Sequence, residues 1–143
     1  MTALKAYTDI EQSKKLAEIL PLESADMEYI LEQWIDEKTH RHKEGYCEFP
    51  VVKVDDDCPL QPITLPCWSL AALLESIPQE IFDGEYIIKY TINIREGSNN
   101  RWVLTYDHYE NINHSYHGLS SDADKLVDAC YEMILKLRKL KLL

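Results

Sequence analysis

The chain of 143 residues is poor in glycine, with 4 glycines and 6 prolines in all. Loops that bind nucleotide phosphates need several glycines at fixed spacing, and the sequence has neither a Walker loop nor a GxGxxG pattern. No serine lies in a GxSxG elbow of the kind that serine hydrolases use. The sequence therefore lacks the common nucleotide-binding and serine-hydrolase motifs.

Long apolar runs and paired cysteines are also lacking. No stretch approaches the roughly 18 apolar residues that a membrane-spanning helix needs, and residues 1–6 do not form the apolar core of a secretory signal. The 4 cysteines include no CxxC pair, so we expect them to be reduced thiols. The sequence predicts a soluble, cytoplasmic protein with no membrane partner.

Positive charge is scarce as well. The 25 acidic residues outnumber the 15 basic ones, which gives a net charge of −10. Residues 1–66 hold 14 acidic and 7 basic residues, against 11 and 8 in residues 67–143, so the acidity lies mainly in the N-terminal half. Direct binding to nucleic acid is not expected, because it needs a basic surface. The acidic surface has two interpretations: it keeps the protein in solution, or it mimics nucleic acid and acts as an inhibitor in the basic groove of a partner.

Two helices are predicted in the N-terminal part. Thr8, followed three residues later by Glu11, has the form of a capping box and opens a helix that ends before Pro21. A second helix is predicted over residues 24–38, because apolar residues recur there at three- and four-residue steps. Those residues are Met27, Ile30, Leu31, Trp34 and Ile35.

The middle of the chain is predicted to be less regular. Residues 39–66 contain four prolines and an acidic run, and we expect at most one short edge strand there, at residues 51–54. A third helix is predicted over residues 67–77, which are compact and apolar and precede Pro78.

A β-hairpin is predicted next, because residues 85–94 and 101–108 alternate between apolar and polar side chains around the turn sequence GSNN. The apolar side chains of both strands share one face only if Ile94 lies opposite Trp102 or Leu104, which requires a loop of three or five residues. Two strands alone are marginally stable. We therefore expect a third strand, from residues 51–54, from residues 113–118 or from a second copy of the protein.

Residues 121–140 are predicted to form the longest amphipathic helix, with Ser121 as its N-cap and Asp124 completing a capping pair. Acidic residues in the first turns and basic residues in the last turn suit the helix dipole. Its apolar stripe consists of Leu126, Val127, Cys130, Met133, Ile134, Leu137 and Leu140. This stripe is expected to pack on the apolar face of the hairpin.

Together these elements predict an α+β fold in a single domain of residues 1–143. Residues 8–38 are predicted to be helical and residues 39–66 to be an irregular linker. Residues 67–143 are predicted to form a helix–hairpin–helix unit.

Four segments carry a resemblance to a known group of proteins. They are TDIEQSKKLAEILPLESADM, LPCWSLAALLESIP, the hairpin that contains a tryptophan, and DKLVDACYEMILKLRKL. Together they resemble a family of small uncharacterised proteins found in gut Bacteroidetes and in their prophages or other mobile elements. The resemblance implies a cytoplasmic protein linked to a mobile element, and it implies no activity, cofactor or site residue.

Candidate metal ligands lie together in the sequence DHYENINHSYH of residues 107–117. They are His108, Glu110, His114 and His117, residue types that bind transition metals. The segment has no helical periodicity that would fix their geometry, as an HExxH motif would. The alternative is a solvated loop rich in turn-forming residues, and no cofactor is predicted.

Two classes of function remain. The first is a non-enzymatic binding module whose acidic N-terminal half contacts a protein partner. A homodimer is also considered, formed through the edge of the predicted hairpin or through an exposed apolar patch on a helix. The second is a small metal-binding protein or enzyme that uses the histidines of residues 107–117. The first is favoured, because the sequence shows no catalytic arrangement of residues.

Overall fold

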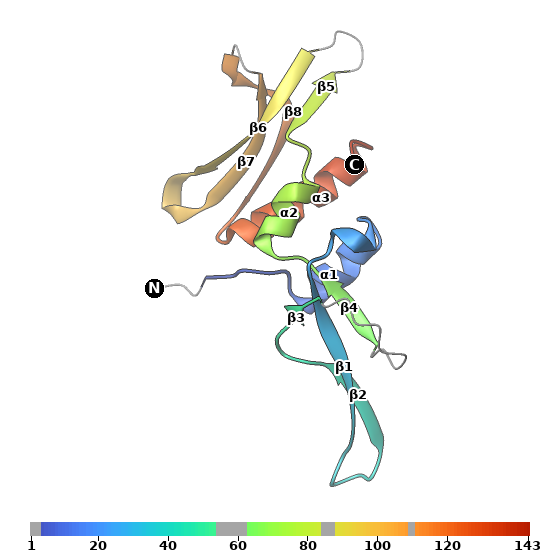
Figure 1. Cartoon of the computed structure of the whole chain (residues 1–143). Coiled ribbons are helices and arrows are strands. Elements are labelled where there is room, and N and C mark those ends of the chain that lie inside the picture. Colours follow the sequence, from blue (N-terminus) through green and yellow to red (C-terminus); the bar gives the residue numbers. More distant parts are fainter. Residues whose placement is uncertain (1–3, 54–62, 84–87, 109–110) are drawn as a thin grey trace. The chain divides into compact units, whose positions relative to one another are not determined.

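A computed structural model shows the fold of the chain (Figure 1). The described residues are 4–53, 63–83, 88–108 and 111–143, with the backbone alone for 111–115 and 117. Helices and two antiparallel four-stranded sheets are present in this part of the chain, which confirms the α+β class. None of the described helices is long and apolar enough to span a lipid bilayer.

The chain divides into two compact units. The N-terminal unit is Tyr7–Ala72, and the C-terminal unit combines Met1–Ala6 with Leu73–Leu143. The boundary falls inside the short helix α2 (Leu70–Ser76), which confirms a helix near the predicted residues 67–77. The single-domain prediction concerns folding as one unit and stays a prediction.

The N-terminal unit begins with α1 (Ile10–Ala17). Its N-cap is Asp9, whose carboxylate accepts the Gln12 N–H at 2.8 Å while the Gln12 side chain accepts the Asp9 N–H at 3.1 Å. The predicted capping box therefore forms one residue later than expected. A 3-10 turn, η1 (Leu22–Ser24), follows Pro21.

The predicted second helix is wrong, because residues 24–38 contain the strand β1 (Met27–Ile35). The apolar residues of this segment fit helical spacing, but they also fit the alternation of a strand. In the strand, Met27 and Tyr29 face the core and Glu28 does not. β1 is also rich in the β-branched and aromatic residues that favour strands. Its pairing with distant strands decides the conformation.

The predicted irregular linker also contains strands. They are β2 (His42–Tyr46), β3 (Val51–Val52) and β4 (Thr64–Cys67), all antiparallel to β1. β2 and β3 pair with the same side of β1, at its residues 31–35 and 27–28, and β4 pairs with the opposite side. The core between this sheet and α1 contains Tyr29, Leu65 and Cys67, with Ile10 packed against them.

The C-terminal unit contains an antiparallel meander in the order β5-β6-β7-β8. Its strands are β5 (Glu80–Asp83), β6 (Ile88–Glu96), β7 (Trp102–His108) and β8 (Asn111–Ala123). The predicted hairpin is β6 and β7, and the predicted third strand at residues 113–118 is part of β8. The predicted strand at residues 51–54 lies instead in the N-terminal unit, as β3.

The register of the hairpin is confirmed. Ile94 lies opposite Leu104, and Glu96 opposite Trp102, which leaves the five residues 97–101 between the paired strands. The turn η2 (Ser98–Asn100) has positive φ at both asparagines, 62° at Asn99 and 58° at Asn100. Asparagine tolerates this conformation better than most residues do.

The C-terminal helix α3 (Leu126–Lys139) packs on the face of the sheet that carries the buried Leu104 and Tyr106. The predicted stripe is largely confirmed, since Val127, Cys130, Met133, Ile134 and Leu137 are buried while Leu140 is exposed. The predicted start is wrong. Ser121 belongs to β8, and its hydroxyl donates to the Ala129 carbonyl at 2.8 Å instead of capping the helix.

Candidate functional site

The predicted metal ligands lie at the end of β7 and along β8. His108 is half-buried, and its ring packs edge-on at 6.0 Å, centroid to centroid, against Tyr90. The backbones of His114 and His117 belong to β8, but their side chains, like all of Glu110, lie outside the described residues. In the described part of the chain no group of three or more His, Cys, Asp or Glu side chains is arranged to hold a metal. The metal site therefore stays a prediction.

Buried hydroxyl and thiol groups meet in the core of the N-terminal unit. The Thr8 hydroxyl is 2.8 Å from the Ser13 hydroxyl and 3.6 Å from the Cys67 sulfur, and it accepts the Trp68 N–H at 3.2 Å. The Tyr29 hydroxyl donates to the Thr8 carbonyl at 2.8 Å. Burial raises the pKa of the Cys67 thiol, and this side chain is fully inaccessible. The cluster therefore holds the core together and has no access to a substrate.

The other described thiols are poor nucleophiles. Burial raises the pKa of Cys130 to about 12, because the thiolate would be desolvated. Cys47 is half-exposed, but a hydrogen bond with the Glu32 carboxylate raises its pKa. A raised pKa leaves less thiolate, the reactive form, at neutral pH. Neither residue has the electropositive surroundings of a catalytic cysteine.

A buried carboxylate lies on the face of the β6–β7 pair that is opposite Tyr106. Asp107 Oδ2 accepts hydrogen bonds from the Asn93 amide at 3.1 Å and from the Thr105 hydroxyl at 2.9 Å. Both Asp107 and Thr105 are buried. These hydrogen bonds replace the hydration that the carboxylate loses on burial. Asp107 therefore joins β6 to β7 and stabilises the sheet.

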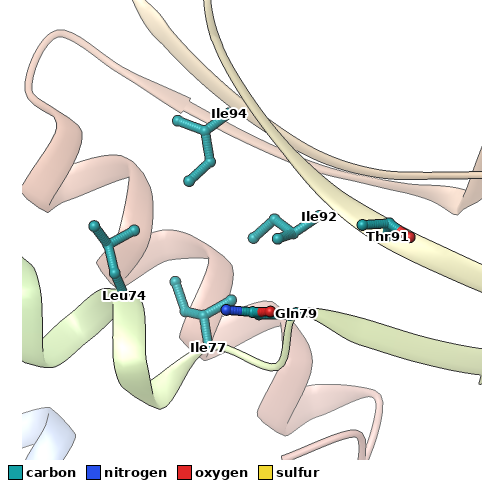
Figure 2. Close-up of a pocket in the computed structure, with 6 residues that line it drawn as sticks. All are labelled: Leu74, Ile77, Gln79, Thr91, Ile92 and Ile94. Atoms are coloured by element: carbon teal, nitrogen blue, oxygen red, sulfur yellow. The ribbon is translucent and has the colours of Figure 1, made fainter.

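A shallow pocket of about 390 Å³ lies in the C-terminal unit (Figure 2). Leu74 and Ile77, from α2 and the residue after it, approach Ile92 and Ile94 of β6, and Gln79 and Thr91 complete the lining. No lining residue is acidic, basic, histidine or cysteine. The pocket therefore provides apolar contact and no group for acid–base or nucleophilic chemistry.

The most exposed feature of the N-terminal unit is the arm, which we define as residues 32–45, the far part of the β1–β2 hairpin (Figure 1). Nearly all of its side chains are exposed, on both faces of the two strands. Successive side chains of a strand point to opposite faces, so Trp34 and Ile35 place apolar area on both. Trp34 is 48% exposed and Ile35 is 58% exposed. This is the largest pair of neighbouring apolar side chains left uncovered on a described strand of this unit.

The turn at the end of the arm is well ordered by Asp36. Its carboxylate accepts the Lys38 N–H at 2.8 Å and pairs with the Lys43 ammonium at 2.9 Å. These interactions, the one with Lys43 first, lower the pKa of Asp36. His40, with φ of 55°, takes the left-handed position of the turn. The arm is therefore a defined hairpin rather than an irregular linker.

Trp34 crosses from β1 over the neighbouring strand. The far end of its indole ring lies over Gly45, where a Cβ atom would be only 3.1 Å from Cη2. Gly45 thus leaves room for the ring on the surface of the arm. Because β2 is an outer strand, the indole ring reaches toward the open edge of the sheet.

Comparison with protein-family models, with curated proteins and with solved structures finds no match to the chain. The function must therefore be inferred from the geometry alone. The arm is exposed on both faces and carries Trp34 and Ile35, which remain 48% and 58% exposed.

Sequence reasoning missed the arm because it assigned the two strands to different classes. Trp34 and Ile35 were predicted to lie on a helix, and residues 42–46 were predicted to be linker. The sequence HKEGY has only one strongly strand-favouring residue, Tyr46, and gives little signal by itself. The contact between Trp34 and Gly45 would have indicated that the two strands pair, but it can be recognised only when the register of the strands is known.

Proposed function

We propose that the protein is a non-enzymatic binding module that contacts a protein partner through the arm. The observation that carries this proposal is the pair Trp34 and Ile35, exposed on opposite faces of an extended hairpin. Exposing large apolar side chains to water is unfavourable, so a partner that covers Trp34 or Ile35 would gain stability from removing its apolar area from water. Tryptophan is also among the residues that contribute most at protein interfaces.

The location of the arm agrees with the expectation that the N-terminal half makes the contact. The N-terminal unit has 14 acidic residues and 6 basic ones. The described buried thiols, the buried carboxylate and the apolar pocket each lack either access or reactive groups, so none of them supports a reaction. Binding is the activity that the exposed groups of this unit support.

The test compares proteins retained by three immobilised full-length chains from an extract of the cells that encode them. One is the parent, one is Trp34→Ala, and the control is Phe82→Ala. Phe82 is 51% exposed and lies on β5 of the C-terminal unit. It is therefore an aromatic side chain of similar exposure to Trp34 that lies outside the arm.

We expect at least one protein to be retained by the parent and by the control, and to be reduced at least about tenfold by Trp34→Ala, as for an interface hot spot. A set of retained proteins that is the same for all three chains would refute the proposal. Circular dichroism of each variant establishes that the fold is intact.

A further inference from the structure

The hydrogen bonds of the arm determine which backbone groups of β2 are free to bind. On an antiparallel strand these groups face alternate sides. Cys47 donates its N–H to the Ile30 carbonyl at 2.9 Å, and the Arg41 carbonyl accepts the Asp36 N–H at 2.9 Å. The odd-numbered residues of β2 therefore face β1.

The even-numbered residues of β2, which are His42, Glu44 and Tyr46, consequently turn their N–H and C=O groups away from β1. No strand in the described part of the chain pairs with that side. A free strand edge is a template for another strand, which can add to it through main-chain hydrogen bonds.

We propose that a second copy of the chain adds to this edge, β2 against β2, in antiparallel orientation about a twofold axis. The inference rests on the proposed function, since it names the partner of the same arm. A twofold interface uses the same surface on both copies and must be complementary to itself. The charges along β2 decide which register meets this requirement.

Most twofold registers place like charges directly opposite each other, which destabilises a strand pair. A register centred on Lys43 or Glu44 sets that residue opposite its own copy. Centring on His42 sets Lys43 opposite Arg41, and centring on Tyr46 sets Glu44 opposite Glu48.

The register centred on Gly45 avoids these conflicts. It places Gly45 opposite its own copy, Lys43 opposite Cys47, and Glu44 opposite Tyr46. The two pairs that Glu44 and Tyr46 form would exchange about four backbone hydrogen bonds, because each hydrogen-bonded pair exchanges two.

Charge complementarity extends beyond the central pairs. Residues 38–43 contain three of the six basic residues of the N-terminal unit and none of its acidic ones. In the Gly45-centred register the end of this segment next to β2, residues 41–43, lies beside residues 47–49 of the second copy, which contain Glu48 and no basic residue. His42 then lies opposite Glu48.

Apolar contacts favour the same register. Each Trp34 ring lies over its own Gly45, so two glycines facing each other bring the two rings to the same part of the interface. Phe49, which is 65% exposed, lies opposite Arg41 of the other copy in this register. The pairing therefore covers apolar side chains that the single copy leaves in water.

Sedimentation equilibrium of the full-length chain tests the inference. We expect a reversible dimer with a dissociation constant on the order of 10 µM, as for a small interface. Glu44→Pro should raise this constant at least about tenfold, because proline removes the outward N–H and places a ring at the edge. Glu44→Ala is the matched control, since it removes the side chain but keeps the N–H, and it should remain dimeric.

A chain that is monomeric up to about 1 mM, or a Glu44→Pro variant that dimerises like the control, would overturn the inference. A second variant makes the test independent of the folding of Glu44→Pro. Lys43→Cys places a thiol opposite Cys47 of the second copy, and antiparallel neighbours lie within disulfide range. Mild oxidation should then link residue 43 of one copy to Cys47 of the other.

Peptide mapping identifies the linked residues, and the control Lys43→Cys with Cys47→Ser should remain unlinked. A link between two copies of residue 43 would contradict the register. If the chain is monomeric but Trp34→Ala still loses a protein from the extract, the second copy is not the partner and the proposed function stands. If neither experiment depends on the arm, both proposals fail.

Discussion

The buried hydroxyl of Thr8 offers a sharp test of the core that supports the arm. Thr8 is fully buried, and its Oγ1 accepts the Trp68 N–H at 3.2 Å and lies 2.8 Å from the Ser13 hydroxyl. It thereby ties the segment before α1 to the residue that follows β4. Thr8→Val keeps the shape of the side chain but removes Oγ1, so that the Trp68 N–H loses this acceptor.

A buried donor without its acceptor costs about 1–3 kcal/mol, and we expect Thr8→Val to lower the free energy of unfolding by about 2 kcal/mol. For a chain of this size that corresponds to a fall in Tm of about 7 °C. Thr8→Ser is the matched control, because it keeps the hydroxyl and loses one methyl group, at a cost of about 1 kcal/mol.

Thermal unfolding followed by circular dichroism measures both variants against the parent, and urea unfolding gives their free energies. The expected order of stability is parent, Thr8→Ser, Thr8→Val. If Thr8→Val is as stable as the parent, or more stable than Thr8→Ser, the hydrogen bonds assigned to this hydroxyl do not hold the core together.

Three further predictions concern other parts of the chain. Glu32→Gln should speed alkylation of Cys47 near pH 8, because loss of the carboxylate lowers the raised pKa of the thiol and increases the thiolate fraction; peptide mapping measures the rate, and no increase would contradict this cause. Ile134→Asp should unfold the C-terminal unit, since it buries an unpaired charge at a fully inaccessible position, and a melting curve like that of the parent would contradict the placement of the stripe. Asp107→Leu should cost about 2 kcal/mol in denaturant unfolding by leaving the buried Thr105 donor and the half-buried Asn93 donor unpaired, whereas Asp107→Asn keeps an acceptor and should cost less; equal losses would contradict this reasoning.

The sequence predicted the C-terminal unit better than the N-terminal one, because its signals are local. Alternation along β6 and β7 left two registers, with Ile94 opposite Trp102 or Leu104, and the structure has the second. The stripe of α3 likewise follows from spacing within one helix. The start of α3 was wrong because Ser121 has a partner, the Ala129 carbonyl, that lies outside any capping motif.

The strand β1 could not be predicted in the same way, because its conformation depends on distant partners. Its apolar residues satisfy helical spacing as well as they satisfy a strand, and only pairing with β4 decides between them. Tyr29, for example, lies opposite Leu65, which is 36 residues away in the sequence. The arm was not predicted for the same reason, because its first strand was assigned to a helix and its second strand to a linker.

The metal site predicted from the sequence remains a hypothesis. Its candidate ligands are His108, Glu110, His114 and His117. It predicts a metal-bearing mass in native mass spectrometry that disappears when His114 and His117 are both replaced by alanine. The link to a mobile element and the mimicry of nucleic acid likewise remain expectations, to which the described residues add nothing.

Residue-resolved amide exchange of β2 tests the central claim most directly, because it reports on the edge itself. In dilute solution the amides of Lys43 and Gly45, which face β1, should be protected, while those of Glu44 and Tyr46 should exchange rapidly. At concentrations where the dimer forms, Glu44 and Tyr46 should become protected as well. If their exchange does not change with concentration, a second copy does not bind at this edge.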